Sequence, residues 1–197
     1  MARPSVEAER REQILRSACR VIAARGVVGL RVADVARDAG VSPGIVHYYF
    51  DTKLALVRAA FEDNFTRSLA RRSEILDATG DSVAVLYSVI ESYLPVGDET
   101  VEAWQVWIEL WAAALQDDAL HDIHDRTYGR WREVVVAIIS EGQARGELAA
   151  GDATTYANML VSMLDGLAVQ VLLGSTSLDV DAMRAVCRRF VDTTLAG

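Results

Sequence analysis

Apolar residues recur at the three- and four-residue spacing of a helix along almost the whole chain, with few turn-forming residues between them. The 197 residues include only 3 prolines and 13 glycines, too few for the many turns of a β-sandwich. The aliphatic run at 134–139 has the composition of a buried strand, but its neighbours contain no proline and a single glycine, so we expect a helix there too. The pattern predicts an all-α protein of about nine helices.

Capping and turn-forming residues bound the expected helices. Gly26 is placed to end the first, Ser42 to cap the third ahead of Pro43, and Thr52 or Asp51 to cap the fourth. The fourth is long enough to join one domain to the next. The expected ranges are 6–25, 32–39, 43–49, a fourth helix ending near 76, 82–94, 100–116, 119–145, 153–173 and 179–195.

Charge is divided unevenly along the chain. Residues 1–72 hold 13 Lys and Arg against 8 Asp and Glu, whereas the remaining residues hold 7 against 20, within a net charge of −8. A basic N-terminal third suits contact with a polyanion. The acidic remainder suits dimerisation or a cationic ligand, unless its acidity only keeps the chain in solution. The division predicts two tasks on one chain.

Composition excludes several classes of protein. The chain is 51% apolar and 24% charged, which is enough to build a core, and its longest aliphatic run is far shorter than the roughly 20 residues that span a bilayer. Charges occupy the N-terminus where a secretory signal needs apolar residues, so we expect a cytoplasmic protein without membrane contact. Cys19 and Cys187 each stand alone in a helical pattern and are expected to be buried thiols.

Two short helices around a glycine-containing turn are predicted by the segment 32–53, VADVARDAGVSPGIVHYYFDTK, as a helix-turn-helix requires. Gly44 keeps the start of the second helix narrow enough for a major groove, and His47, Tyr48 and Tyr49 supply side chains that reach bases and phosphates. With ILRSACRVIAARG before it, this segment resembles the tetracycline-repressor (TetR) family of bacterial transcriptional regulators over residues 8–58. The alternative is a three-helix domain that only packs.

The resemblance implies phosphate contacts by Ser42, Tyr49 and Lys53, and base-edge contacts by positions 43–48. A helix N-terminus binds phosphate, and a bound phosphate explains a lysine in the first turn of a helix. Arg31 departs from the family, where most members have a threonine that caps the second helix. His47 also departs from the family, because many members have a tyrosine at this position. A packing role or a phosphate contact is as consistent with His47 as base reading is. The predicted DNA-binding residues are Arg31, Ser42, Pro43, Gly44, Ile45, His47, Tyr48, Tyr49 and Lys53.

The C-terminal part resembles the choline-responsive, BetI-like branch of the family in EAWQVWIELWAAALQDDAL, YGRWREVV, GQARGELAAGD and MLDGLAVQVLL. The resemblance implies an effector pocket and a dimer interface. Aromatic residues at helical spacing, with carboxylates such as Glu109 or Asp165, suit a quaternary ammonium or polyamine through cation–π attraction. Alternatively, the rings fill the core and Asp165 makes a surface or interhelix hydrogen bond. The predicted effector-binding residues are Trp104, Trp107, Trp111, Tyr128, Trp131 and Asp165.

Apolar stripes on the last two helices suit either a four-helix interface between two subunits or the protomer's own core. With the resemblance, they predict a homodimer whose reading helices face the half-sites of a palindrome. The stripe residues are Leu160, Leu164, Leu167, Val171, Ala182, Val186 and Phe190. We expect a DNA-binding domain at 1–53 and an effector-binding and dimerisation domain at 54–197.

An enzyme or small-molecule carrier with a vestigial helix-turn-helix is the alternative from another class. The chain has no glycine-rich phosphate loop and no HExxH sequence, so we expect no catalytic residue and no cofactor. A divalent metal at His121 and His124, with Asp117, Asp118 and Asp125 nearby, competes with a solvated helix start, which we favour. The sequence therefore predicts a ligand-responsive transcriptional regulator, with repression favoured over activation.

Overall fold

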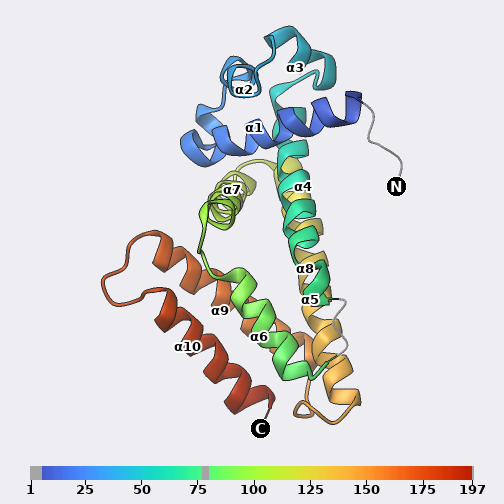
Figure 1. The fold of residues 1–197 in the computed structure, drawn as a ribbon, viewed down its shortest axis with the longest axis vertical. Coiled ribbons are helices and arrows are strands. Elements are labelled where there is room, and N and C mark those ends of the chain that lie inside the picture. The colour runs from blue at the N-terminus through green and yellow to red at the C-terminus, as the bar shows by residue number, and fades with distance from the viewer. Residues whose placement is uncertain (1–5, 77–79, 197) are drawn as a thin grey trace. The chain divides into compact units, whose positions relative to one another are not determined.

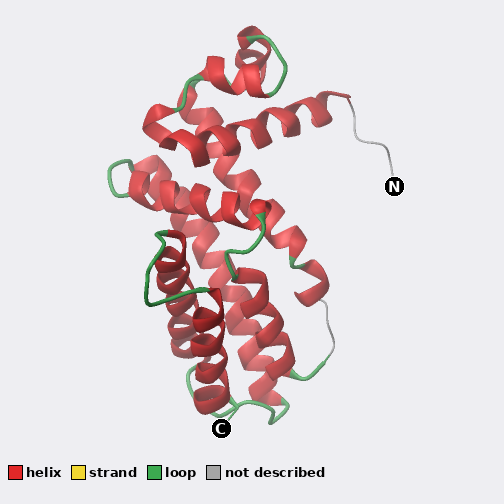
Figure 2. Cartoon of the chain, turned by 60° about the vertical axis from the view of Figure 1, so that its left-hand side comes forward, coloured by secondary structure: helices red, strands yellow, loops and turns green. Residues whose placement is uncertain are grey.

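The computed structural model describes residues 6–76 and 80–196, and every regular element within them is a helix (Figures 1 and 2). The first six helices are α1 Val6–Gly29, α2 Val32–Asp38, α3 Pro43–Tyr49, α4 Lys53–Arg71, α5 Ser73–Leu76 and α6 Ser82–Tyr93. They are followed by α7 Asp98–Ala114, α8 Asp118–Ala144, α9 Ala153–Leu172, α10 Val180–Phe190 and a π-helical turn, η1, Val191–Leu195. The all-α prediction is confirmed, and none of the described helices is long and apolar enough to cross a membrane.

The expected fourth and last helices are each divided in two, which accounts for the larger number of elements. After α4 the Arg72 N–H bonds to the Leu69 carbonyl only three residues back, at 3.0 Å, and the Ser73 hydroxyl bonds to the Ala70 carbonyl at 2.9 Å. These bonds satisfy the last carbonyls of α4 locally, so the helix ends before α5. At the C-terminus, η1 continues directly from α10.

Side-chain caps define the start of α3 and α4. The Ser42 Oγ accepts a hydrogen bond from the Ile45 N–H at 3.4 Å, and Pro43 follows as the first helical residue. The Thr52 Oγ1 accepts from the Ala55 N–H at 3.0 Å, so Thr52 is the capping residue of the two that the sequence offered. The bounds of α3 match the prediction.

Two glycines at positive φ change the direction of the chain in α1 and after α2. Gly40, at φ +64°, ends α2 in a Schellman motif in which the Val41 N–H bonds to the Ala36 carbonyl at 2.9 Å. Gly26, at φ +72°, interrupts the helical geometry inside α1. The predicted stop at Gly26 is therefore a break, after which the chain makes one more turn to Gly29.

Contacts divide the chain into two compact units. Unit 1 consists of Met1–Ser68 and Glu102–Thr127, and it holds α1 to α3 with most of α4 and α7 and the start of α8. Unit 2 consists of Leu69–Val101 and Tyr128–Gly197, and it holds α5, α6, α9, α10 and the rest of α8. The segment 1–53 lies wholly in unit 1. Along the chain, α4, α7 and α8 each contribute residues to both units.

The core of unit 1 joins the helix-turn-helix to α7. Val35 of α2 and Val46 of α3 are fully buried in one apolar cluster with Leu56 of α4. Val106 and Leu110 of α7 belong to the same cluster. The reading segment is therefore packed on α7 as well as on α1 and α4.

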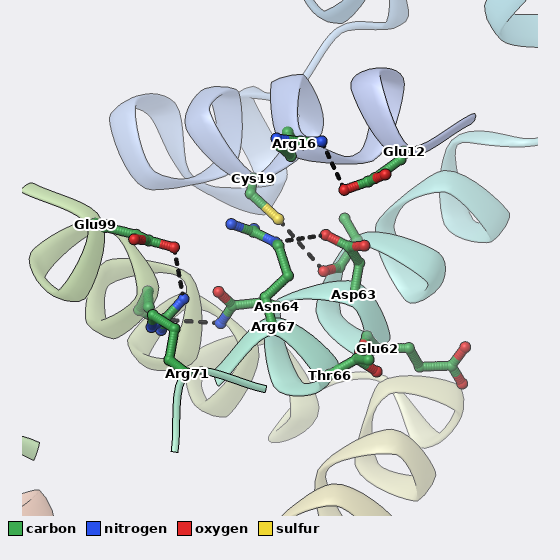
Figure 3. Close-up of polar contacts among 12 residues, drawn as sticks. Glu12, Arg16, Cys19, Glu62, Asp63, Asn64, Thr66, Arg67, Arg71 and Glu99 are labelled. Carbon is green, nitrogen blue, oxygen red and sulfur yellow. Dashed lines mark hydrogen bonds and ion pairs between the residues drawn. The ribbon is translucent and has the colours of Figure 1, made fainter. Parts of the chain in front are cut away.

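Polar side chains make contacts where α1, α4 and α7 meet, as Figure 3 shows. The Arg67 Nε donates to Asp63 at 2.8 Å within α4, and the Asn64 Nδ2 donates to the Ala103 carbonyl of α7 at 3.2 Å. The Cys19 thiol donates to a backbone carbonyl of α4 at 3.4 Å, and burial raises its pKa to about 12. Both cysteines are buried and free, as predicted.

The core of unit 2 is formed where α6, α9 and α10 lie side by side (Figure 1). Leu160 and Leu164 of α9 have no exposed surface in the protomer, and neither do Met183 and Cys187 of α10. Two leucines that were predicted for a dimer interface thus pack the protomer's own core. The other five predicted interface residues keep exposed surface: Leu167, Val171, Ala182, Val186 and Phe190.

Candidate functional sites

α3 turns one face to the core and another to solvent. Val46 is fully buried, whereas Ile45 is 39% exposed and Tyr48 74% exposed. His47 is exposed as well, and so are Ser42, Pro43 and Gly44 at the start of the helix. The side chains predicted to face base edges thus lie on the solvent face of α3, except for Val46.

Gly44 is not required by the chain itself. Its φ is not positive, and a Cβ placed there would meet only the Ser42 Oγ, at an ordinary contact distance of 3.8 Å. The absence of a side chain therefore serves no packing need among the described residues. It keeps the N-terminal end of α3 narrow toward the solvent.

Three further predicted residues flank α3. Arg31 is the exposed residue before α2, and its side chain makes no cap bond. Lys53 is exposed, and its Nζ donates to the Val28 carbonyl at 3.1 Å. Tyr49 is half-buried against the core cluster, with its ring edge-to-face with Tyr48 at 5.1 Å. Tyr49 therefore braces the exposed tyrosine in addition to its predicted phosphate contact.

Ion pairs neutralise the carboxylates of α2. Asp34 pairs with Arg25 at 2.6 Å and with Arg37 at 2.9 Å, and Asp38 pairs with Arg20 at 2.5 Å. Because these acids are paired with arginines of α1 and α2, they do not offset the exposed cations near α3. Arg31 and Lys53 remain exposed near α3, and exposed cations suit contact with a polyanion.

Glu109 of α7 makes a hydrogen bond within unit 1. Its Oε2 accepts a hydrogen bond from the Val27 N–H at 2.9 Å, directly after the break in α1. A Cβ at Gly26 would lie 2.8 Å from the same oxygen, so the Glu109 carboxylate would have to shift if Gly26 were substituted. Glu109 therefore caps the broken end of α1 and ties α7 to it.

The three tryptophans of α7 make packing contacts within unit 1. Trp104 is buried and lies edge-to-face with Trp111, with ring centroids 6.2 Å apart. Trp107 lies edge-to-face with Phe65 of α4, also at 6.2 Å, and contacts the core cluster. The structure thus gives these predicted effector residues the contacts of a core.

The remaining predicted effector residues lie in one cluster of unit 2. The Tyr128 hydroxyl of α8 donates to the Asp165 carboxylate of α9 at 2.7 Å. Burial raises the pKa of Asp165 to about 6, although the Tyr128 hydrogen bond lowers it. Trp131 stacks on Tyr93 of α6 with centroids 5.4 Å apart, and the Arg72 guanidinium lies over both rings, at 4.9 Å from Tyr93 and 5.3 Å from Trp131.

Tyr93 and Arg72 were missed by the sequence reasoning. Tyr93 is the last residue of α6 and shares no spacing with the aromatic residues of α8. Arg72 was counted only as part of the basic N-terminal third. No periodic pattern marks either residue, because contacts between residues far apart in the chain bring both of them to Trp131.

Two chemical alternatives find no support in the described residues. No group of three metal-ligating side chains comes together there, and Asp117 instead caps α8 by accepting from the Ala119 and Leu120 N–H groups at 2.9 and 3.2 Å. The pentapeptide GVSPG at 40–44 fits the G-x-S-x-G spacing of hydrolases. It joins two helices, whereas a nucleophile elbow joins a strand to a helix.

Residues 14–60 match the model of bacterial regulatory proteins of the tetR family, and residues 83–196 match the C-terminal domain of BetI-type transcriptional repressors. The second match covers more than half of the chain. The chain belongs to the TetR family. It is a transcriptional regulator and not an enzyme.

Individual relatives agree with this membership of the TetR family. The transcriptional regulator BetI of Cronobacter sakazakii is 26% identical over 100% of this chain and 96% of its own length. A solved regulator from Saccharomonospora viridis, in complex with choline, is 30% identical with a TM-score of 0.89 over 96% of this chain and 98% of its own. A TetR-family regulator from Rhodococcus sp. is 32% identical with a TM-score of 0.84, over 94% and 98%.

Membership confirms two expectations drawn from the sequence. TetR-family proteins bind DNA through the N-terminal domain and respond to small molecules, and here the tetR match begins inside α1 and contains α2 and α3. The BetI-type match begins inside α6 and runs through α10. The BetI-like resemblance of the C-terminal part is thereby confirmed.

Proposed function

We propose that this TetR-family protein is a cytoplasmic repressor that binds a palindromic operator as a homodimer and is released by a small cationic effector. The outward face of α3 carries the DNA-binding part of the proposal. The exposed residues of this face include Ile45, His47 and Tyr48. The helix that carries them begins at a narrow N-terminus that Ser42 caps.

In this proposal the residues of the reading segment divide into two groups. Ser42, Tyr49, Lys53 and Arg31 hold phosphates, which fixes the register of the protein on DNA. The solvent side of α3, from Pro43 to Tyr48, faces base edges in the major groove. Acceptor or donor groups of His47 and Tyr48 then supply sequence discrimination.

The proposed dimer uses the exposed sides of α9 and α10. Val186 is 44% exposed, and Leu173 and Met159 of the same helix pair are exposed as well. Together with the partly exposed stripe residues, they form an apolar surface that a second copy would cover. Two-fold symmetry would present two copies of α3 to the two half-sites of a palindrome.

The proposed effector site is the cluster of Tyr128, Trp131, Asp165 and Tyr93. The related S. viridis protein was solved with choline, a quaternary ammonium compound. In this chain a buried carboxylate and aromatic rings supply the two features that hold such a cation. The α7 tryptophans stay predicted effector residues, although their described contacts are packing contacts.

Coupling between effector and operator would follow from linkage. An effector that prefers a conformation in which the two reading segments no longer fit the operator lowers operator affinity by the same differential free energy. Such coupling is typically about 1–3 kcal/mol, which corresponds to roughly 5- to 150-fold. The helices α4 and α8, which each contribute residues to both units, provide a covalent route for it.

Selection of random duplex DNA on the purified protein, repeated at two salt concentrations, tests the regulator. We expect enrichment of one palindrome at both concentrations, because base contacts survive when phosphate attraction is screened. Retention that simply vanishes as salt rises, with no enriched sequence, would contradict specific operator binding.

A further inference from the structure

The turn that follows Gly26 is held by a side chain from outside the N-terminal domain. Helical geometry breaks at Gly26, so the Val27 N–H begins a new turn, where helix amides need an acceptor from elsewhere. The Glu109 Oε2 of α7 accepts from this N–H at 2.9 Å. Glu109 lies outside the tetR match at 14–60 and outside the predicted DNA-binding domain at 1–53. The backbone of this turn therefore depends on a residue of α7.

Glu109 lies on a firmly packed stretch of α7. Its neighbours Val106 and Leu110 have no exposed surface and belong to the core cluster of unit 1. Glu109 itself is partly buried, so its carboxylate is confined beside the break in α1. A side chain that is anchored by packing in this way can fix the position of the backbone group that it binds.

Lys53 bonds to the next residue of the same turn. Its Nζ donates to the Val28 carbonyl at 3.1 Å, and no carboxylate in the described part of the chain forms an ion pair with it. Lys53 is the first residue of α4, where the helix dipole disfavours a cation, so the ammonium gains from this carbonyl. An ammonium has three N–H donors, and the contact uses one of them. Two donors remain for a phosphate oxygen.

We propose that Glu109 is a positioning residue for operator binding, which acts on DNA through Lys53. Glu109 fixes the backbone of Val27 and Val28, the Val28 carbonyl holds the Lys53 ammonium, and the ammonium binds an operator phosphate. The inference rests on the proposed function, in which Lys53 is a phosphate contact. It goes beyond that function because it assigns a part in DNA binding to α7.

The variants E109Q and E109M test the hydrogen bond to Val27. Both remove the charge and keep a side chain of similar length, but only glutamine keeps an oxygen acceptor. We expect E109M to bind the selected palindrome roughly threefold to tenfold more weakly than E109Q, as the loss of one hydrogen bond implies. Anisotropy titration measures both affinities, and circular dichroism checks that both variants are folded. Equal affinities of E109Q and E109M would overturn the inference.

A matched pair elsewhere in the chain is the control. Glu141 is an exposed residue of α8 in unit 2 that pairs with Arg145 at 3.0 Å within the same helix. E141Q and E141M make the same two chemical changes there and should bind the palindrome with equal affinity. A difference between them as large as that at Glu109 would assign the effect to methionine itself and overturn the inference.

The K53Q background separates positioning from a merely structural role. With no ammonium left to position, E109M and E109Q should bind with equal affinity in K53Q protein. If Glu109 only stabilises the fold of unit 1, the difference between E109M and E109Q should persist in K53Q. Persistence of the difference would therefore overturn the inference.

Two outcomes distinguish the inference from the proposed function. If K53Q weakens operator binding but E109M binds as tightly as E109Q, Lys53 stays a phosphate contact and only the role of Glu109 is wrong. If K53Q binds the operator as tightly as the wild-type protein, Lys53 holds no phosphate, and the inference falls together with that part of the proposed function.

Discussion

Asp165 is partly buried in unit 2, where its carboxylate accepts a hydrogen bond from the neutral Tyr128 hydroxyl. Because burial raises its pKa to about 6, above the ordinary value of 3.8, the folded state binds a proton that the unfolded state has already lost between these two values. The stability that this proton supplies is present below pH 4 and is lost as the pH rises through 6.

Replacement of Asp165 by asparagine should stabilise the protein without effector. Asparagine keeps an acceptor for Tyr128 but carries no charge, so we expect a gain in the free energy of unfolding of about 1–3 kcal/mol at pH 8. The gain should shrink at pH 5, where the aspartate is protonated. Urea denaturation of both proteins at the two pH values measures it. A variant that is equally stable or less stable at pH 8 would contradict the account.

Lys53 offers a second prediction at the scale of one residue. If it binds an operator phosphate, Lys53→Gln should weaken binding to every DNA sequence and reduce the slope of log affinity against log salt by about 1. Arg126→Gln removes the same charge from an exposed ion pair with Glu62 and serves as the control. Anisotropy titrations over a range of salt give both slopes. Equal slopes for the two variants would remove Lys53 from the DNA contact.

Single residues differ in how far the sequence alone predicted them. Ser42, Pro43 and Gly40 were predicted correctly because caps and turns depend on neighbours in the chain. The contact of Glu109 with Val27 joins residues 82 positions apart and leaves no local signal. Arg72 and Tyr93 were missed for the same reason, since packing between helices brings them together.

At the scale of elements, the break in α1 at Gly26 and the Glu109 side chain of α7 that caps it depend on each other. Gly26 and Gly40 both have positive φ, but a Cβ at Gly26 would lie 2.8 Å from Glu109, whereas nothing lies within 4 Å of one at Gly40. Gly26 also has ψ 168°, a region of positive φ that essentially only glycine occupies, so the effect of Glu109 is isolated by comparing Gly26→Ala with and without the Glu109 side chain.

Alanine at each glycine measures the two effects. Gly40→Ala should cost about 1 kcal/mol of unfolding free energy from strain at positive φ. Gly26→Ala should cost roughly 2–3 kcal/mol, because the strain and the clash add. In a Glu109→Ala background Gly26→Ala should cost less, because only the backbone strain at Gly26 remains. If Gly26→Ala costs the same in both backgrounds by urea denaturation, Glu109 does not constrain Gly26.

Helix boundaries were predicted closely where a capping side chain or a glycine marks them. The end of α4 was not, because the turn at Arg72 depends on a three-residue backbone bond and a serine hydroxyl. The packing of α7 into the core of the helix-turn-helix was also not predicted. Apolar spacing shows that a helix has a buried face but does not show which helices cover it.

At the scale of the whole molecule, the account requires a dimer. Val186→Glu places a charge on the exposed apolar side of α10 and should yield a folded monomer with at least tenfold weaker operator binding. Leu115→Glu adds the same charge at a leucine that is 82% exposed elsewhere in the chain, and it should change neither property. Sedimentation and circular dichroism distinguish a folded monomer from an unfolded one. A folded Val186→Glu dimer would place the interface elsewhere.

Periodicity predicted the helical class and the TetR resemblance predicted the regulator, yet neither could divide an apolar stripe between core and interface. Leu160 and Leu164 have the same spacing as Leu167, but the fold buries the first two fully in the protomer. That distinction depends on the orientation of α9 against α6 and α10, which one sequence does not contain.

The most direct test of the central claim is the operator affinity of the intact dimer with and without saturating effector. Anisotropy of the selected palindrome should show an affinity lower by roughly 5- to 150-fold when saturating choline is present. Sedimentation under the same conditions should show that the protein is still a dimer. An operator affinity that is unchanged while the ligand is bound and the dimer is intact would contradict a ligand-released repressor.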